Sequence, residues 1–240
     1  MRVLDLFSGR GGFSKAWKNN GHEVVTLDNN RDGKFQSTHS IDIYDFQPLD
    51  HYAVGHFDVI LGGVPCTEYA RWGMRGVNRS LQNKSEEELR PNNNLLKEFI
   101  RIRDALQPKF WIVENVQASV SFISHFLGKP FRIGRRWFWS NMLGFKDFYG
   151  ETEMKLIHLS YIPKTFRYKY FNKRLNKYTW VGRGRRGPAH VLSNIEYPIS
   201  EALMYFILND IKGWKKRSYE RIREIRKSRD DYNKNKYITE

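Results

Sequence analysis

Two short stretches carry residue types that can perform chemistry. Cys66, the only cysteine of the chain, follows Pro65 directly after the apolar run FDVILGG, and WIVENV brings Glu114 and Asn115 to the end of a later apolar run. The carboxyl ends of buried strands are where α/β folds place their reactive groups. A partly desolvated carboxyl group has a raised pKa and can carry a proton. From these residues alone, two interpretations of each stay open. Cys66 is either a nucleophilic thiol or a small buried hydrophobic residue, and Glu114 is either a proton-handling carboxyl group or a helix-capping charge.

A glycine-rich turn, DLFSGRGGF, follows the first apolar run. Glycines at a turn from strand to helix let the backbone approach a ligand closely. A dinucleotide fingerprint requires a third spaced glycine at position 14, where the chain has Ser14, so NAD and FAD are disfavoured. Asp28 ends the second apolar run, and Asp42 lies near the end of the strand-like stretch IDIYDF. Together these two carboxylates match one adenosine lying across the sheet edge.

Strand and helix patterns alternate in the first half of the chain. Strand character is read in RVLDLF, HEVVTLD, IDIYDF, FDVILGG and KFWIVENV, and helix character in GFSKAWKNN and NNNLLKEFIRIRDALQP. Strands that alternate with helices imply crossover connections and a mostly parallel sheet with helices on both faces. We predict an α/β fold, a Rossmann-like doubly wound sheet, with a small basic insert in the second half.

The composition points to a polyanionic partner. The formal net charge is +15, and aromatic residues make up 15% of the 240 residues. Rings interleaved with Lys and Arg, as in TFRYKYFNKRLNKYTW, suit bases and phosphates of nucleic acid, although a charged solvated surface is the alternative. A single cysteine excludes internal disulfides and multi-cysteine metal sites. We expect no metal, no membrane span and no signal peptide, hence a soluble cytoplasmic protein.

The ordered motifs DLFSGRGGF, LD, IDI, GGVPC and ENV resemble the cytosine-C5 DNA methyltransferases, which use S-adenosylmethionine. The resemblance implies the class I methyltransferase fold and a flipped-out target base. It implies that Cys66 adds to C6 of cytosine, that Glu114 contacts N3 and that Asn115 holds the geometry. For the family's Arg-x-Arg motif, PFRIGRRWFW offers Arg136 as the second arginine and Arg132 as a displaced first one.

The same resemblance assigns a cofactor site and a mobile catalytic loop. Pro65 would form the floor between the methyl donor and the base. The segment TEYARWGMRGVNRSLQNKSEEELR corresponds to the catalytic loop, although Tyr69 and Ala70 replace the family's Phe-Ser pair. The loop arginines suited to phosphates are Arg71, Arg75 and Arg79. The residues expected around the cofactor, besides Pro65, are Phe7, Ser8, Gly9, Gly11, Gly12, Asp28, Asn29, Asp42 and Ile43.

The second half resembles the family only loosely. We expect a catalytic core over 1–140, a short target-recognition insert over 141–187, a return to the core over 188–212 and a basic tail over 213–240. The return contains VLSNIEYPISEALM, similar to the family's last motif. The insert residues expected to contact nucleic acid are Arg167, Lys169, Arg183 and Arg185.

The predicted function is therefore DNA cytosine-5 methylation by a monomer. Two alternatives stay open at this point: an RNA (tRNA) cytosine-C5 methyltransferase, and a noncatalytic nucleic-acid-binding protein that retains the fold. The residues do not distinguish a restriction–modification, a viral and a regulatory role.

Overall fold

The structure, a computed structural model, describes part of the chain. The described residues are 1–29, 36–75, 78, 81–133, 136–142, 144, 168–172, 177–181, 197–210, 212–213, 216 and 220. In chain order the main elements are β1 Arg2–Leu6, α1 Lys15–Asn19, β2 Glu23–Asp28, β3 His39–Ser40, β4 Val59–Gly62, α2 Thr67–Gly73, α3 Glu86–Leu89, α4 Asn94–Leu106, β5 Phe110–Asn115, α5 Val120–Leu127, β6 Phe131–Ile133, β7 Arg136–Ser140, β8 Tyr168–Asn172, β9 Lys177–Val181 and α8 Tyr197–Ile207.

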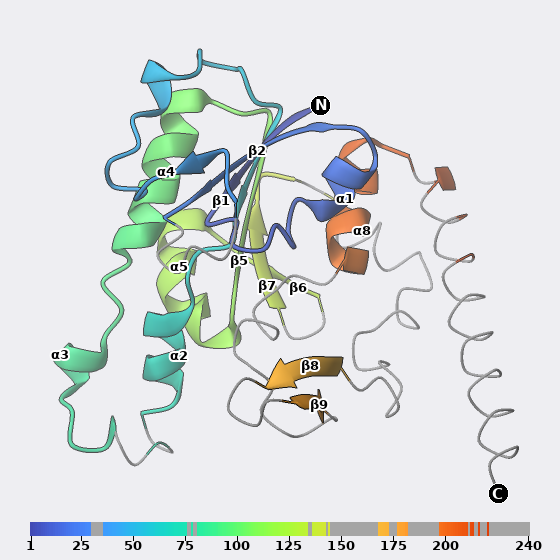
Figure 1. Cartoon of the computed structure of the whole chain (residues 1–240). Helices are drawn as coiled ribbons and strands as arrows, with labels where there is room; N and C mark the ends of the chain where they lie inside the picture. Colours follow the sequence, from blue (N-terminus) through green and yellow to red (C-terminus); the bar gives the residue numbers. More distant parts are fainter. Residues whose placement is uncertain are drawn as a thin grey trace, which may run out of the picture. The chain divides into compact units, whose positions relative to one another are not determined.

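A seven-stranded sheet organises the first part of the chain, in the order β3-β2-β1-β4-β5-β7-β6 (Figure 1). The five strands from β3 to β5 are parallel, whereas β7 runs antiparallel to both β5 and β6. Helices α4 and α5 lie on one face and α1 on the other (Figure 1). The strand order reverses between β1 and β4, the position where doubly wound sheets bind ligands. The predicted doubly wound, mostly parallel α/β fold is confirmed.

The expected strand over IDIYDF is wrong in its position. The strand of this region, β3, covers His39–Ser40, and residues 41–46 form turns instead. Asp45 N–H donates to the Asp42 carbonyl, which is a turn contact rather than a ladder bond. Ile43 and Phe46 are both buried but lie three positions apart, whereas the buried residues of a strand recur at every second position, so this run is a turn packed against the core.

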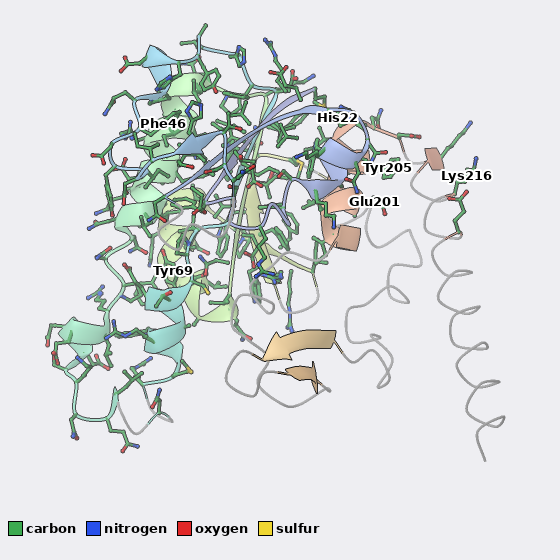
Figure 2. All side chains as sticks on the ribbon, in the orientation of Figure 1. His22, Phe46, Tyr69, Glu201, Tyr205 and Lys216 are labelled. Carbon is green, nitrogen blue, oxygen red and sulfur yellow. The ribbon has the colours of Figure 1, made fainter. Side chains whose placement is uncertain are left out.

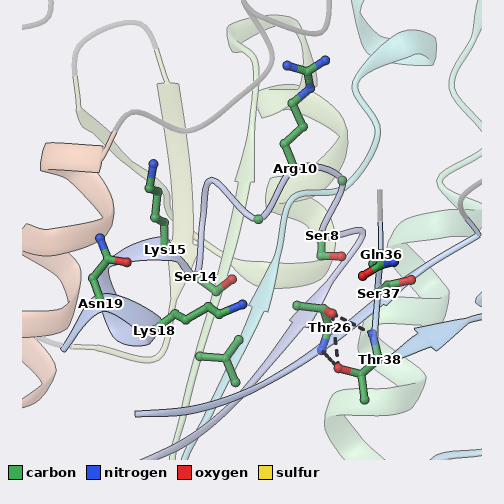
Figure 3. A pocket seen from close by; sticks show the side chains of 13 residues that line it. Ser8, Arg10, Ser14, Lys15, Lys18, Asn19, Thr26, Gln36, Ser37 and Thr38 are labelled. Carbon is green, nitrogen blue, oxygen red and sulfur yellow. Dashed lines mark hydrogen bonds between the residues drawn. The ribbon is translucent and has the colours of Figure 1, made fainter. Parts of the chain in front are cut away.

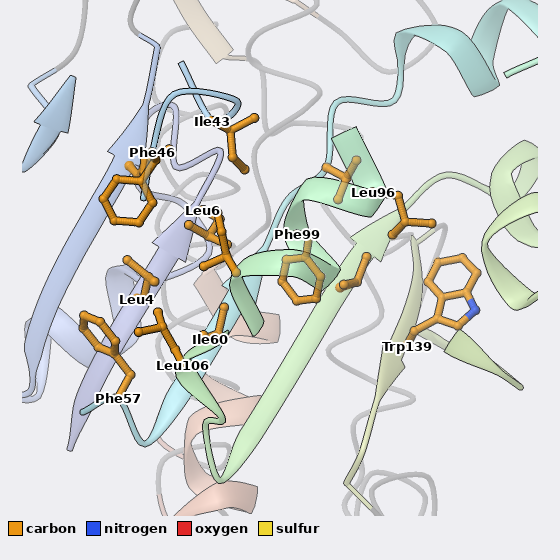
Figure 4. Close-up of a cluster of buried hydrophobic side chains, with 14 of the residues drawn as sticks. Leu4, Leu6, Ile43, Phe46, Phe57, Ile60, Leu96, Phe99, Leu106 and Trp139 are labelled. Carbon is orange, nitrogen blue, oxygen red and sulfur yellow. The ribbon is translucent and has the colours of Figure 1, made fainter. Parts of the chain in front are cut away.

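The main core fills the space between the sheet and α4. Leu4 and Leu6 of β1, Ile60 of β4 and Phe99 of α4 are fully buried in one cluster (Figure 4). Because side chains alternate along a strand, Asp5 points to the opposite face, where α1 lies. The apolar residues that recur at helical spacing along α4 thus form the face by which this helix packs on the sheet.

Gly62 at the end of β4 makes a close approach to α4. A Cβ atom added there would lie 2.5 Å from Cδ2 of the buried Phe99 ring. We expect Gly62→Ala to lower the free energy of unfolding by about 1–3 kcal/mol, because the core must be overpacked. The matched control is Gly63→Ala, whose added Cβ would meet only the Phe7 carbonyl oxygen at 3.8 Å. Denaturant unfolding of both variants checks this, and equal losses would contradict it.

The chain divides into two compact units, Met1–Leu143 with Asn194–Glu201, and Gly144–Ser193 with Ala202–Glu240. Within the first unit, Ser200 at the start of α8 donates to the Phe13 carbonyl at 2.6 Å and accepts from Ala16 N–H at 3.3 Å. These two hydrogen bonds join the segment VLSNIEYPISEALM, which contains Ser200, to the chain that follows the glycine-rich turn. The second unit contains the antiparallel pair β8–β9.

The division into catalytic core, recognition insert, return to the core and basic tail, expected from the sequence, stays a prediction. In the described part of the chain, no helix is both long and apolar enough to cross a bilayer.

Candidate active site

Cys66 lies between the end of β4 and the start of α2. It is half-buried and occupies the N-cap position of α2, where its carbonyl accepts from Ala70 N–H at 2.8 Å. The sequence predicted a long polar loop after Cys66, but residues 67–73 form a helix. The thiol is therefore carried on regular structure at the carboxyl end of the sheet.

Glu114 and Arg136 form a buried ion pair on adjacent strands. The Arg136 guanidinium donates to Glu114 Oε1 at 2.7 Å, and both side chains are less than a tenth exposed. In the β5–β7 register Glu114 faces Phe138, so Arg136 lies two residues away along β7 and on the same face as Glu114. Burial of both charges is tolerated because each one compensates the other.

The thiol and this ion pair interact electrostatically. Burial raises the pKa of Cys66, the negative charge of Glu114 raises this pKa further, and Arg136 lowers it. The three residues thus share one environment, although they come from three different elements. In the free protein the thiol is held mostly protonated at neutral pH, because its raised pKa lies above the ordinary value of 9.0.

Asn115 connects the two halves of this site. Its side-chain amide donates to the Val64 carbonyl at 3.0 Å, and its oxygen accepts from Val116 N–H at 2.8 Å. Val64 immediately precedes Pro65 and Cys66, so the buried amide holds the segment of the nucleophile against the end of β5. Pro65, between Val64 and Cys66 in the chain, is exposed.

The two candidate arginines lie apart. Arg132 of β6 pairs with Trp137 in the ladder, and its guanidinium carbon lies 5.8 Å from the Trp137 ring centroid. Trp137 and Arg136 are consecutive in β7, so their side chains point to opposite faces of the sheet. The structure therefore brings Arg136 to Glu114 but does not bring Arg132 there.

The glycine-rich turn is bonded to the end of β2. Gly9 N–H donates to Asp28 Oδ2 at 2.8 Å, and Ser8 N–H donates to the Leu27 carbonyl at 3.1 Å. Gly9 and Gly11 have φ angles of +49° and +71°, which other residues adopt only with strain. Phe7, with φ of +59°, begins the turn directly after β1. Gly12 is half-buried on the way to α1.

Ser14, used in the sequence only to disfavour a dinucleotide, has a structural partner that the sequence did not indicate. Its hydroxyl donates to Asp5 Oδ2 at 2.6 Å, and both residues are buried. Burial raises the pKa of Asp5 to about 7, the Ser14 hydrogen bonds lower it, and Asp28 raises it slightly. An acid inside the apolar-looking RVLDLF run was the available signal, because acids are rarely buried without a partner.

Asp28 and Asp42 lie at neighbouring strand ends. Asp28 pairs with Ser40 in the β2–β3 ladder, and Asp42 follows two residues after Ser40. The Asp42 carboxylate accepts from Tyr44 N–H at 3.3 Å. Ile43 is buried, and Asn29 is exposed directly beyond β2. The two carboxylates thus follow neighbouring strands of the sheet, and their contact with an adenosine stays a prediction.

A hollow of about 890 Å³ flanks the glycine-rich turn on the side of α1 (Figure 3). Ser8, Gly9 and Gly11 of the turn and Lys18 of α1 are among its lining residues, of which Figure 3 labels Ser8 and Lys18. None of its lining residues, all of them described, is an acid. Of the expected cofactor residues, Ser8, Gly9 and Gly11 line this hollow, whereas Asp28, Asp42 and Pro65 do not.

The expected nucleic-acid contacts are only partly described. Arg71 is exposed on α2, and Arg75 stacks on Trp72 with its guanidinium carbon 4.0 Å from the ring centroid. Lys169 lies within β8. Arg79, Arg167, Arg183 and Arg185 lie outside the described residues.

Comparisons with known proteins identify the family of this chain. A type II methyltransferase of Fusobacterium nucleatum, M.FnuDI, is 29% identical over 127 residues, which is 50% of this chain and 34% of that protein. M1.HphI of Haemophilus parahaemolyticus is 31% identical over 128 residues, which is 48% of this chain and 32% of that protein. The matched segments are thus about a third of the length of these relatives.

The solved structures include a DNA modification methyltransferase-like chain of an E. coli prophage. It is 22% identical and covers 58% of this chain and 46% of that chain, with a TM-score of 0.39. The model of the C-5 cytosine-specific DNA methylase family matches residues 1–125, which include Cys66, Glu114 and the glycine-rich turn. Because this match covers more than half of the 240 residues, the chain belongs to the C-5 cytosine-specific DNA methylase family.

Proposed function

We propose that the protein transfers a methyl group to C5 of a cytosine in DNA, through a covalent bond between Cys66 and C6 of the base. The observation that carries this proposal is the convergence of Cys66 with the buried Glu114–Arg136 pair at the ends of β4 and β5. A thiol beside a paired carboxylate is the constellation that nucleophilic addition to a flipped-out pyrimidine requires.

The residues have distinct roles in this chemistry. The Cys66 thiolate adds to C6, and the electron pair of the C5–C6 double bond moves towards C5, which becomes nucleophilic. Glu114, oriented by Arg136, carries a proton when the base is bound and donates it to N3, which stabilises the negative charge that the addition places on the ring. The proton returns to Glu114 when the ring is restored. After methylation, a base removes the C5 proton, the C6–S bond breaks and Cys66 leaves as thiolate. Asn115 keeps the Cys66 segment against β5 throughout.

The described residues fit S-adenosylmethionine. Asp28 lies at the end of β2, where an acid accepts from ribose hydroxyls, and the glycine-rich turn lets the cofactor approach the backbone closely. Phe7, Asp42 and Ile43 lie at the same edge of the sheet. When bound, this cofactor supplies an electrophilic methyl group.

Asp28→Ala is expected to weaken cofactor binding by about 10–100-fold, because a charged hydrogen-bond acceptor is lost. The Gly9 N–H also loses its partner, so the glycine-rich turn is less well fixed. Asp28→Asn keeps an acceptor for that N–H and should lose less. Titration calorimetry with S-adenosylmethionine measures both variants, and unchanged affinity in Asp28→Ala would remove the assignment of the β2 end.

The function is tested by trapping the covalent adduct. The protein is incubated with labelled S-adenosylmethionine and a DNA duplex containing 5-fluorocytosine, then separated by denaturing electrophoresis. Fluorine at C5 prevents loss of the proton, so the enzyme stays attached to the base. A labelled band that is absent with Cys66→Ala supports the reaction, the nucleophile and DNA as substrate together.

The other outcomes of this test are also informative. A band with fluorinated RNA and none with DNA would move the substrate to RNA. No band with either, while cofactor binding is measurable, would favour the noncatalytic alternative.

A further inference from the structure

The first turn of α2, the helix that begins after Cys66, is joined by two hydrogen bonds to the two residues that precede α4. The Tyr69 hydroxyl donates to Asn93 Oδ1 at 2.9 Å, and Asn92 N–H donates to Glu68 Oε2 at 3.2 Å. Both bonds join residues 24 positions apart, so they hold together the two ends of the segment that runs from α2 to α4. The resemblance drawn from the sequence places the catalytic loop in this segment.

Tyr69 is seated more firmly than a loop residue. Its side chain is 2% exposed and belongs to the main core, with the Phe122 ring centroid 6.2 Å away (Figure 2). Because the hydroxyl is removed from water there, leaving it without a partner has a cost, and Asn93 supplies the partner. Burial also raises the pKa of Tyr69 strongly, so this hydroxyl remains a donor.

Asn93 is a rigid acceptor. It is the N-cap of α4 and has φ of +60° and ψ of +18°, a left-handed conformation that Asn tolerates better than most residues. Its carbonyl accepts from Lys97 N–H in the first turn of α4 at 3.0 Å. Since α4 packs on the sheet through Phe99, a bond to Asn93 is a bond to the core.

The far end of α2 is also seated on the body. The Trp72 and Phe122 rings meet edge to face at 5.5 Å, and a Cβ atom added to Gly73 would lie 2.8 Å from the Ala118 Cβ. Arg75, beyond the helix, contacts Trp72 and Glu86 instead, with Nε 3.8 Å from Glu86 Oε1. Contacts with the core thus extend from Tyr69 to Gly73. After the helix, Arg75 makes a cation–π contact and an ion pair instead.

We propose that the Tyr69 hydroxyl, held by Asn93, is a positioning group for Cys66. It fixes the first turn of α2 on Asn93, the N-cap of α4, and thereby holds Cys66, the N-cap of α2, in place after the end of β4. Tyr69 touches neither substrate nor cofactor in this role and acts through the helix that Cys66 caps. The effect of Tyr69 on catalysis rests on the proposed function, whereas its effect on the position of Cys66 does not.

The test uses the fact that Cys66 is the only thiol of the chain. Full-length wild type, Tyr69→Phe, Asn93→Gly and the double variant are reacted with iodoacetamide, without DNA or cofactor, over a range of pH. Tyr69→Phe keeps the ring and its packing, and Asn93→Gly keeps the left-handed conformation. The matched control is Tyr52→Phe, which loses an equivalent bond of 2.6 Å to His39 Nε2 near β3.

We expect alkylation to become about fivefold faster in Tyr69→Phe and in Asn93→Gly. One hydrogen bond no longer holds the first turn of α2, so iodoacetamide reaches the Cys66 thiol more often. The pH midpoint should move down towards the ordinary thiol value, since burial is the main cause of the raised Cys66 pKa. The double variant should equal either single one, because both remove the same bond. Tyr52→Phe should match the wild type. Thermal unfolding well above the assay temperature confirms that each variant is folded.

Wild-type reactivity in Tyr69→Phe, additive effects in the double variant, or the same acceleration in Tyr52→Phe would each overturn the proposal. Steady-state methylation then adds a second readout, in which Tyr69→Phe should lower kcat and leave the KM for DNA unchanged. If the thiol results hold and no methylation is seen with any variant, the fastening of Cys66 stands and only the proposed function fails.

Discussion

Cys66→Ala is expected to abolish methyl transfer while leaving S-adenosylmethionine binding unchanged. The thiolate makes the bond to C6 on which every later step depends, so no other residue replaces it. Apart from Pro65, the residues proposed to hold the cofactor lie at or after the ends of β1, β2 and β3, whereas Cys66 follows β4. Turnover is measured with labelled cofactor and cytosine-containing duplex, and binding by calorimetry.

Cys66→Ser is the sharper companion variant. It keeps a hydroxyl of similar size in the same half-buried position, so packing and the start of α2 are preserved. A serine hydroxyl is far less ionised than a thiol, and we expect no turnover. Substantial activity in this variant would rule out covalent catalysis by residue 66.

Arg136→Met is expected to lower the free energy of unfolding by about 3–5 kcal/mol, because it leaves Glu114 buried without its ionic partner. It should also raise the pKa of Cys66, since the neighbouring positive charge that lowers this pKa is removed. Methyl transfer should be lost, because Glu114 is no longer oriented. Denaturant unfolding and the pH profile of Cys66 alkylation measure the two structural effects.

Glu114→Gln provides the opposite electrostatic change at the same site. Removing the negative charge should lower the pKa of Cys66, so alkylation at a fixed neutral pH becomes faster. Turnover should fall by about 10²–10⁴-fold, the usual contribution of a proton-handling group. Shifts of the same sign in Arg136→Met and Glu114→Gln would contradict the geometry of the three residues.

Much of the fold was determined by local sequence patterns. The apolar runs of β1, β2, β4 and β5 and the helical spacing of α4 bury enough surface to decide their own secondary structure. Each of these segments therefore appeared in the sequence with nearly its observed bounds. The run IDIYDF misled, because its apolar residues suggested a strand, whereas the structure buries Ile43 and Phe46, three positions apart, from a turn.

The residue types of the site were also present in the sequence. Cys66 after Pro65, and Glu114 with Asn115 after an apolar run, mark strand ends without any knowledge of their distance. The parallel order of β4 and β5 then places them at one edge, since parallel strands end on the same side.

Only the tertiary structure decided which arginine joins Glu114. Arg132 and Arg136 are both near the expected motif, and the strand register, set by packing across the sheet, puts them on opposite faces. The Tyr69–Asn93 bond likewise joins residues with no local relation in the sequence. Contacts of this kind depend on where whole elements pack, and that is determined by the shape of the assembled core rather than by neighbours along the chain.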